Sequence, residues 1–151
     1  MSDEAHFPFI REAIKLADTA VEHGNHPFGA VLVKDGVVLL EAENTVTTGH
    51  DMTNHAEMNL VRLANSHYDP EFLKDCILYT STEPCAMCMG AIYWSGIKTM
   101  VYACSEGRLK EITGGGLNMA SRTLMATASN PVTVIGPILQ DEADPAHLRF
   151  W

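Results

Sequence analysis

The sequence has few basic residues and an excess of acidic ones. It contains 10 Lys and Arg against 19 Asp and Glu, which gives a formal net charge of −9 at pH 7. Beyond Thr113 the only basic residues are Arg122 and Arg149. Proteins that bind nucleic acid normally carry a basic patch, because contacts with phosphates supply much of their affinity. The composition therefore disfavours a nucleic-acid partner and fits a small, weakly charged ligand better.

Long apolar runs are absent as well. No run approaches the roughly 18 residues that a membrane-spanning helix needs. The acidic start, Met1-Ser2-Asp3-Glu4, lacks the charge pattern of a signal peptide. The chain has only four cysteines, and disulfides between them would need an oxidising compartment. We therefore expect a cytoplasmic protein without a membrane partner, in which two of the cysteines act as ligands.

The remaining composition is ordinary for a globular protein. Hydrophobic residues make up 46% and charged residues 19% of the 151 residues, and this length can bury a full core. The chain contains no repeat, linker or low-complexity segment. We expect a single domain over residues 1–151.

Helical and strand patterns alternate along the chain, which predicts right-handed crossovers and a partly parallel sheet. Ligand sites in such sheets lie at the carboxyl ends of strands. The predicted helices cover residues 9–22, 53–65 and 84–94, a segment around Arg122, and a short terminal helix from Asp144 or Pro145; the predicted strands cover residues 28–33, 37–42, 76–81, 99–104 and 132–135.

Two short motifs carry the chemistry. They are His55-Ala56-Glu57 and Pro84-Cys85-Ala86-Met87-Cys88. One imidazole and two thiols make three zinc ligands, and three protein ligands with an open fourth position are typical of a catalytic zinc ion. Glu57 lies two residues from the histidine, which is close enough to handle a proton on a water at the metal. We therefore predict Zn²⁺ as the cofactor, with His55, Cys85 and Cys88 as ligands and Glu57 as the catalytic group.

The spacing of these residues places the site at two helix starts. In a regular helix His55 and Glu57 would point about 200° apart, so they share a metal only where the helix begins. Thr53 or Asn54 is the predicted cap of that helix. Cys85 and Cys88 lie one turn apart, and the positive ends of both helices favour thiolate over thiol.

These motifs combine into a known pattern of zinc-dependent base deaminases. The chain resembles the cytidine deaminase-like superfamily over residues 8–104, and within it the branch of bacterial guanine deaminases and tRNA adenosine deaminases. The resemblance implies a three-layer α/β/α sandwich with a mixed sheet of about five strands. It also implies hydrolytic deamination with release of ammonia, and a homodimer. The strings that carry it are residues 27–33, 44–48, 53–57 and 78–92.

The resemblance suggests four substrate contacts, each with a plainer alternative. Relatives use the residue matching Asn44 to hydrogen-bond the base, although this side chain could only shape the turn after a strand. Phe28 is expected to form the pocket wall or stack on a flat ring, and plain core packing is its alternative. Trp94 is expected to line the pocket, or else to be core. Trp151 is expected to act as a lid, or else to pack within a terminal helix.

Several functions remain open from the sequence. Guanine is the first substrate candidate, and cytosine, another aminopurine, a nucleoside or an aminotriazine fit the same chemistry. A tRNA adenosine deaminase is the main alternative, and a non-catalytic zinc module is another. A redox pair of Cys85 and Cys88 would not explain His55 and Glu57. Residues 105–151 contain no motif that identifies the ring.

Overall fold

A mixed five-stranded sheet organises the molecule, in the strand order β2-β1-β3-β4-β5. The computed structural model describes residues 2–151. Strand β1 pairs antiparallel with both β2 and β3, and the β3–β4 and β4–β5 pairs are parallel. The strands are β1 (Gly29–Lys34), β2 (Val37–Glu43), β3 (Ile77–Thr82), β4 (Thr99–Cys104) and β5 (Thr133–Ile135). The expected hairpin and the partly parallel sheet are both confirmed.

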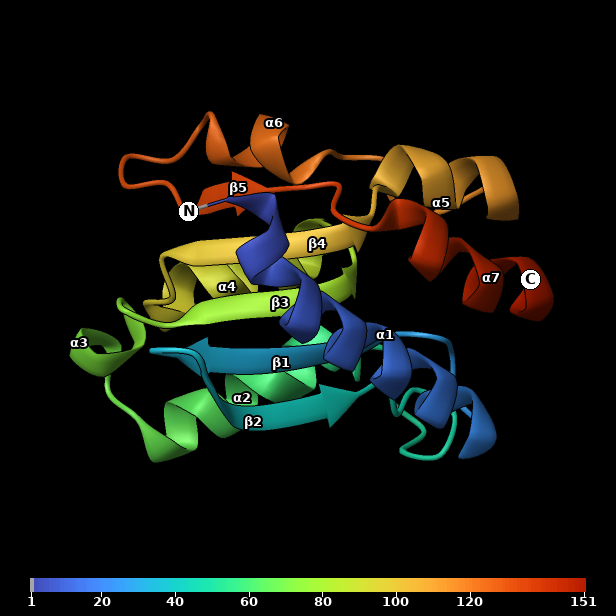
Figure 1. The fold of residues 1–151 in the computed structure, drawn as a ribbon, viewed down its shortest axis with the longest axis horizontal. Coiled ribbons are helices and arrows are strands. Elements are labelled where there is room, and N and C mark those ends of the chain that lie inside the picture. Colours follow the sequence, from blue (N-terminus) through green and yellow to red (C-terminus); the bar gives the residue numbers. More distant parts are fainter. Residues whose placement is uncertain (1) are drawn as a thin grey trace.

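Helices cover both faces of this sheet (Figure 1). Helices α1 and α7 lie on one face, and α2 and α4 lie on the other, so the predicted three-layer α/β/α fold is confirmed. The helices are α1 (Phe7–Glu22), α2 (Ala56–His67), α3 (Pro70–Leu73), α4 (Ala86–Ser95), α5 (Glu106–Thr113), α6 (Ser121–Met125) and α7 (Gln140–Phe150), preceded by a 3₁₀-helix at Asp3–His6.

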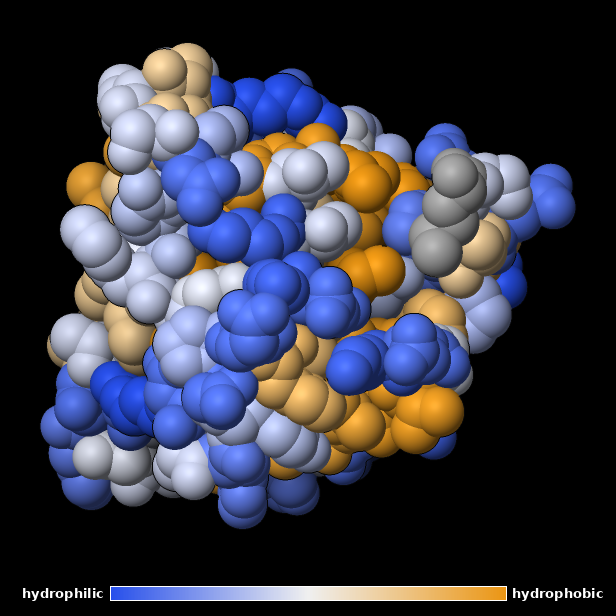
Figure 2. Space-filling model, turned by 90° about the vertical axis from the view of Figure 1, so that its left-hand side faces the viewer, coloured by the Kyte–Doolittle hydropathy of each residue, from blue (hydrophilic) through white to orange (hydrophobic). Residues whose placement is uncertain are grey.

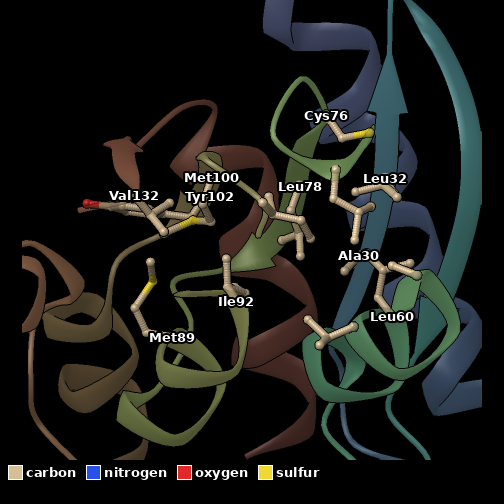
Figure 3. Close-up of a cluster of buried hydrophobic side chains, with 14 of the residues drawn as sticks. Ala30, Leu32, Leu60, Cys76, Leu78, Met89, Ile92, Met100, Tyr102 and Val132 are labelled. Carbon is tan, nitrogen blue, oxygen red and sulfur yellow. The ribbon is translucent and has the colours of Figure 1, made fainter. Parts of the chain in front are cut away.

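Alternation along the central strands divides the core into two halves. Leu32, Leu78 and Met100 face α2 and α4, where they join a buried cluster with Leu60 and Ile92 (Figure 3). Their neighbours in the sequence point to the other face, because successive strand residues alternate sides. This second cluster, against α1 and α7, includes Val31, Tyr79, Val101, Ile10 and Ala143.

Helix α1 approaches β1 closely at Gly29. A Cβ at this position would lie 2.4 Å from the carbonyl oxygen of Ala13 and 2.5 Å from the Cβ of Leu16. No side chain fits at such distances, so only glycine permits this contact. The contact fixes the start of β1, next to Phe28.

Several element boundaries differ from the sequence-based expectations. Helix α2 begins after His55, not after Thr53 or Asn54, and α4 begins after Cys85, not at Pro84. The reason is local: His55 and Cys85 have extended backbones, with ψ angles of 154° and 170°. The terminal helix begins earlier than predicted and contains Pro145 in its interior. Helices α3 and α5 were not expected.

The end of the molecule opposite the carboxyl ends of β3 and β4 is shown in Figure 2. There, hydrophilic side chains lie between hydrophobic areas. Within residues 2–151, no helix combines the length and the apolar character needed to cross a bilayer.

Candidate active site

A cavity of about 470 Å³ opens at the carboxyl ends of β3 and β4. The starts of α2, α4 and α5 meet there, as expected for an α/β sheet with a site beyond its strand ends. The cavity brings together both sequence motifs and parts of the last third of the chain. Its lining residues are His26, Phe28, Asn44, His55, Glu57, Glu83, Cys85, Glu106, Leu109, Thr113, Gly115, Gly116, Leu117 and Trp151.

The donor atoms of His55, Cys85 and Cys88 lie within 4.8 Å of one another. The Nδ1 atom of His55 is 3.7 Å from the Sγ of Cys85 and 3.5 Å from the Sγ of Cys88. Tetrahedral zinc, with Zn–S near 2.3 Å and Zn–N near 2.0–2.1 Å, would hold such a nitrogen and sulfur about 3.6 Å apart. The three side chains therefore fit a zinc ion, and three protein ligands are typical of a catalytic zinc site.

The two thiols behave as a coupled pair. A hydrogen bond from Cys88 lowers the pKa of Cys85 to about 4, with a further contribution from His55, against the opposing effect of burial. The same hydrogen bond raises the pKa of Cys88, together with burial. Cys85 therefore supplies a thiolate readily, and metal binding would displace the proton that Cys88 retains.

Glu57 lies in the first turn of α2 and is only 4% exposed. Its Oε1 accepts a hydrogen bond from the hydroxyl of Thr80 on β3. Burial raises the pKa of Glu57. A carboxyl group in this state, at the cavity wall beside His55, is suited to taking up and returning a proton.

Asn44 presents hydrogen-bond donors to the cavity. Its Oδ1 accepts from the backbone N–H of Val46 at 3.0 Å. The Nδ2 group has no hydrogen-bond acceptor within the described chain, although the residue is 1% exposed and lines the cavity. A ligand atom that accepts a hydrogen bond, such as a ring carbonyl, would complete this amide.

Asn25, which sequence reasoning overlooked, holds the loop after Asn44 in place. Its Oδ1 accepts from the backbone N–H groups of Thr47 and Thr48, at 3.1 and 3.0 Å. Asn25 is 2% exposed, so these hydrogen bonds are shielded from water. The only sequence signal for Asn25 is its position just after the first helix. An asparagine there is typical of an ordinary helix end, so it did not indicate a role at the site.

Aromatic side chains form another wall of the cavity. Phe28 contacts the ring of His147 at a centroid distance of 5.2 Å, and His26 contacts that of Trp151 at 5.3 Å. Trp94 is different: it is 82% exposed on α4 and is not among the described residues that line the cavity. Helix α4 is apolar on all sides, so its sequence pattern did not indicate which face is exposed.

His147 joins this wall to the sheet. The indole Nε1 of Trp151 donates to Nδ1 of His147 at 3.1 Å. The other ring nitrogen, Nε2, therefore carries the proton and donates to the hydroxyl of Thr82, at 2.7 Å. Burial lowers the pKa of His147 from 6.5 to about 4.

This shift predicts a pH-dependent stability. Between pH 6.5 and about 4 the unfolded chain binds a proton at His147 that the folded chain does not, so the free energy of unfolding falls as the pH falls. We expect the His147→Gln protein to lose this part of the pH dependence, which is on the order of 2–3 kcal/mol. Urea unfolding at pH 7, 5.5 and 4.5 measures it. An unchanged slope in His147→Gln would contradict the assignment, and His67→Gln is the control for removing an exposed imidazole.

Glu83, which was not expected as a site residue, and Glu106, one of several acidic residues in the last third of the chain, both line the cavity and connect it to that part of the chain. The carboxylate of Glu83 accepts from the backbone N–H of Glu106 at 2.9 Å and from the backbone N–H of Ser121 at 2.7 Å. Burial, followed by the charges of Cys85 and Glu83, raises the pKa of Glu106 to about 7. Both residues follow the ends of buried strands, which is the sequence signal that could have indicated them.

Known proteins resemble this chain in sequence and fold. Residues 3–104 match the family model "Cytidine and deoxycytidylate deaminase zinc-binding region". The chain is 42% identical to a probable cytosine deaminase of Schizosaccharomyces pombe (strain 972 / ATCC 24843) over 154 residues, covering 98% of this chain and 93% of that protein. It is 50% identical to the guanine deaminase of Bacillus subtilis (strain 168) over 102 residues, covering 67% of this chain and 65% of that protein.

A solved structure agrees with these relatives. The structure of guanine deaminase from Nitrosomonas europaea matches with a TM-score of 0.82 at 25% identity, covering 93% of this chain and 81% of that one. The matched family is zinc-binding, and the His55, Cys85 and Cys88 donors fit that metal. The chain therefore belongs to the cytidine and deoxycytidylate deaminase family of zinc-dependent hydrolases that act on C–N bonds.

Proposed function

We propose that this deaminase converts a free nucleobase to the corresponding carbonyl compound and ammonia, with guanine as the first candidate. The observation that carries the proposal is one cavity that combines a zinc-ligand set, a buried carboxyl group and an amide with free donors. The 50% identity to a guanine deaminase, across the part of the chain that holds both motifs, supports guanine.

The proposed roles follow from position. His55, Cys85 and Cys88 would hold zinc, which would supply a Lewis acid able to make water nucleophilic near neutral pH. The hydroxyl of Thr80 donates a hydrogen bond to Oε1 of Glu57, so Oε2 is the oxygen that takes up and releases the proton. Glu57 takes one proton from the attacking water and returns it to a ring nitrogen. The second water proton leaves with the amine as ammonia, so the atoms balance.

The remaining wall orients the ring. The Nδ2 group of Asn44 donates to a ring carbonyl, and Phe28 offers a flat apolar surface. Trp151, held by His147, covers the cavity beside His26. An apolar wall and a few placed polar groups are typical of small-molecule sites.

Cytosine is the second candidate, for a specific reason. The similarity to the probable cytosine deaminase extends over 98% of the chain, and so over nearly all of the last third, which supplies part of the cavity wall. The similarity to the Bacillus subtilis guanine deaminase spans only 67% of the chain. The net charge of −9 supports either small base over tRNA.

A homodimer and a cytoplasmic location are also part of the proposal. The exposed Trp94, beside Tyr93 on α4, supports the homodimer that the family resemblance implies. The cytoplasmic location rests on composition and on the use of two cysteines as zinc ligands.

An ammonia-release screen tests the substrate. The zinc-loaded protein is assayed with guanine, cytosine, their nucleosides, aminotriazines and tRNA anticodon loops. We expect turnover of a free base, with guanine the best, and no reaction with tRNA. Turnover of tRNA alone would overturn the proposal, whereas turnover of cytosine without guanine would exchange the two candidates. A zinc-chelated sample controls for ammonia that does not depend on the metal.

A further inference from the structure

We infer that the imidazole of His26 donates a hydrogen bond to a ring nitrogen of the substrate, next to the carbonyl oxygen that Asn44 binds. The inference rests on the proposed function and deepens it. It makes a pair of neighbouring acceptors on one edge of the ring, such as O6 and N7 of guanine, the feature that the cavity recognises.

His26 lines the cavity with a ring that no other protein group hydrogen-bonds. Within residues 2–151, neither of its ring nitrogens has a hydrogen-bond partner, and neither is sealed from the cavity. The contacts that the ring does make are with the rings of Phe150 and Trp151, at centroid distances of 5.5 and 5.3 Å. The imidazole is therefore held in place by packing, while its nitrogens stay available to a ligand.

The backbone joins His26 to the wall that carries Asn44. The backbone N–H of Phe28 donates to the carbonyl oxygen of His26 at 2.9 Å, in a tight turn across Pro27. The backbone N–H of Asn44 donates in turn to the carbonyl oxygen of Phe28 at 3.0 Å. Asn25, which directly precedes His26, also binds the loop after Asn44. His26 and Asn44 therefore lie on either side of Phe28 in one wall, where a flat ligand can reach both.

Side-chain N–H donors are scarce in the cavity. The indole N–H of Trp151 is bound by His147, and His55 belongs to the zinc-ligand group. Among the lining side chains within residues 2–151, this leaves Asn44 and His26 to donate N–H groups to a ligand. Burial, followed by the charge of His55, lowers the pKa of His26, so its ring is neutral at pH 7 and carries one N–H donor.

Two neighbouring donors suit guanine better than cytosine. The O6 and N7 atoms of guanine are acceptors on one edge, away from the carbon that carries the amino group. In cytosine, the position next to O2 on the side away from the amino group is N1–H, which is a donor. The pairing of Asn44 with His26 therefore favours a purine with a carbonyl group at C6.

The test combines a substitution with a change of one ligand atom. The proteins are Glu57→Gln, which should bind without turnover, and the double variants that add His26→Phe or, as the control, His67→Phe at an exposed imidazole on α2. The ligands are guanine, cytosine and 7-deazaguanine, in which a C–H group replaces N7. Isothermal titration calorimetry gives each dissociation constant, and zinc content with thermal unfolding shows that each protein is intact.

We expect the Glu57→Gln protein to bind guanine about 3- to 10-fold more tightly than 7-deazaguanine, as for one neutral hydrogen bond. Adding His26→Phe should weaken guanine binding by the same factor and leave 7-deazaguanine binding unchanged, so that the preference disappears. His67→Phe should keep the preference. Phenylalanine preserves a ring against Phe150 and Trp151, and any change in that packing would affect both ligands equally.

The inference fails if guanine and 7-deazaguanine lose equal affinity in His26→Phe, since His26 then only packs. It also fails if the preference for guanine survives the substitution, or if the Glu57→Gln protein does not bind guanine. A loss confined to cytosine would likewise overturn it, because the other imidazole tautomer would then accept from N1–H. If the His26→Phe protein loses zinc or its fold, His26→Leu is measured by the same criteria.

Failure of the proposed function appears in a different measurement. A wild-type, zinc-loaded protein that binds guanine without releasing ammonia would contradict the deaminase reaction with this base. The preference between guanine and 7-deazaguanine depends on binding alone and would still decide the role of His26.

Discussion

Replacing Glu57 with glutamine is expected to lower the rate of ammonia release by about 100- to 10,000-fold, the range over which general acid–base groups act. The glutamine side chain keeps the size of the original and its hydrogen bond to Thr80, but it cannot carry a proton from water to the ring. The zinc ligands lie outside the change, so zinc content should remain at one ion per chain. Kinetics under saturating base and metal analysis of the same sample provide both measurements.

Glu41→Gln is the matched control, since Glu41 is an exposed glutamate on β2 that does not line the cavity. It should retain the wild-type rate. A Glu57→Gln protein with a near-normal rate would remove Glu57 from the chemistry, whereas loss of zinc together with the rate would point to a structural role instead.

Replacing Cys88 with serine is expected to remove both zinc and activity. Cys88 is fully buried and supplies one of three ligands, and a neutral hydroxyl there is a far weaker donor than a thiolate. The loss of zinc affinity should exceed about 100-fold, because changes in residues that only support ligands already cost 10- to 100-fold. Zinc retained after dialysis, and the stabilisation that added zinc gives in thermal unfolding, report the loss.

Cys76→Ala provides the comparison for this experiment. Cys76 is also buried and also a free thiol, but it precedes β3, at the end of that strand away from the site. It should retain zinc and activity, with only the modest loss of stability that a small cavity causes. Full zinc occupancy in Cys88→Ser would mean that another residue completes the ligand set.

Local sequence signals were sufficient for the metal site. His55 and Cys85 lie beside their helix starts, and Cys88 follows Cys85 within one turn, so spacing placed the ligands at two helix starts, and the match to a known deaminase pattern predicted that these starts converge. The β1–β2 hairpin and the strand at Thr99–Cys104 were predictable for the same reason, since their signals are contained in a few consecutive residues.

Residues whose position depends on distant packing were not predictable in this way. Trp94 looks equivalent to its neighbours because α4 is apolar on all sides, and only the placement of α4 against α2 leaves it exposed. Pro145 looked like a helix start, but buried contacts of Ala143 and Ala146 continue α7 through it. The positions of Glu106 and Asn25 matter because of their surroundings. The partners of Asn25 and the cavity beside Glu106 are formed by segments more than twenty residues away in the sequence.

The hydrogen bonds of Glu83 have a consequence for how such a protein can change over time. Through these hydrogen bonds the carboxylate of Glu83, close to Cys85 in the sequence, holds the starts of α5 and α6. The groups proposed for the chemistry all lie at or before Cys88 in the sequence. Substitutions and length changes between Gly107 and Ala120 can therefore remodel one wall of the cavity without displacing a metal ligand. We expect such changes to alter which ring the cavity accepts while the metal ligands and Glu57 stay in place.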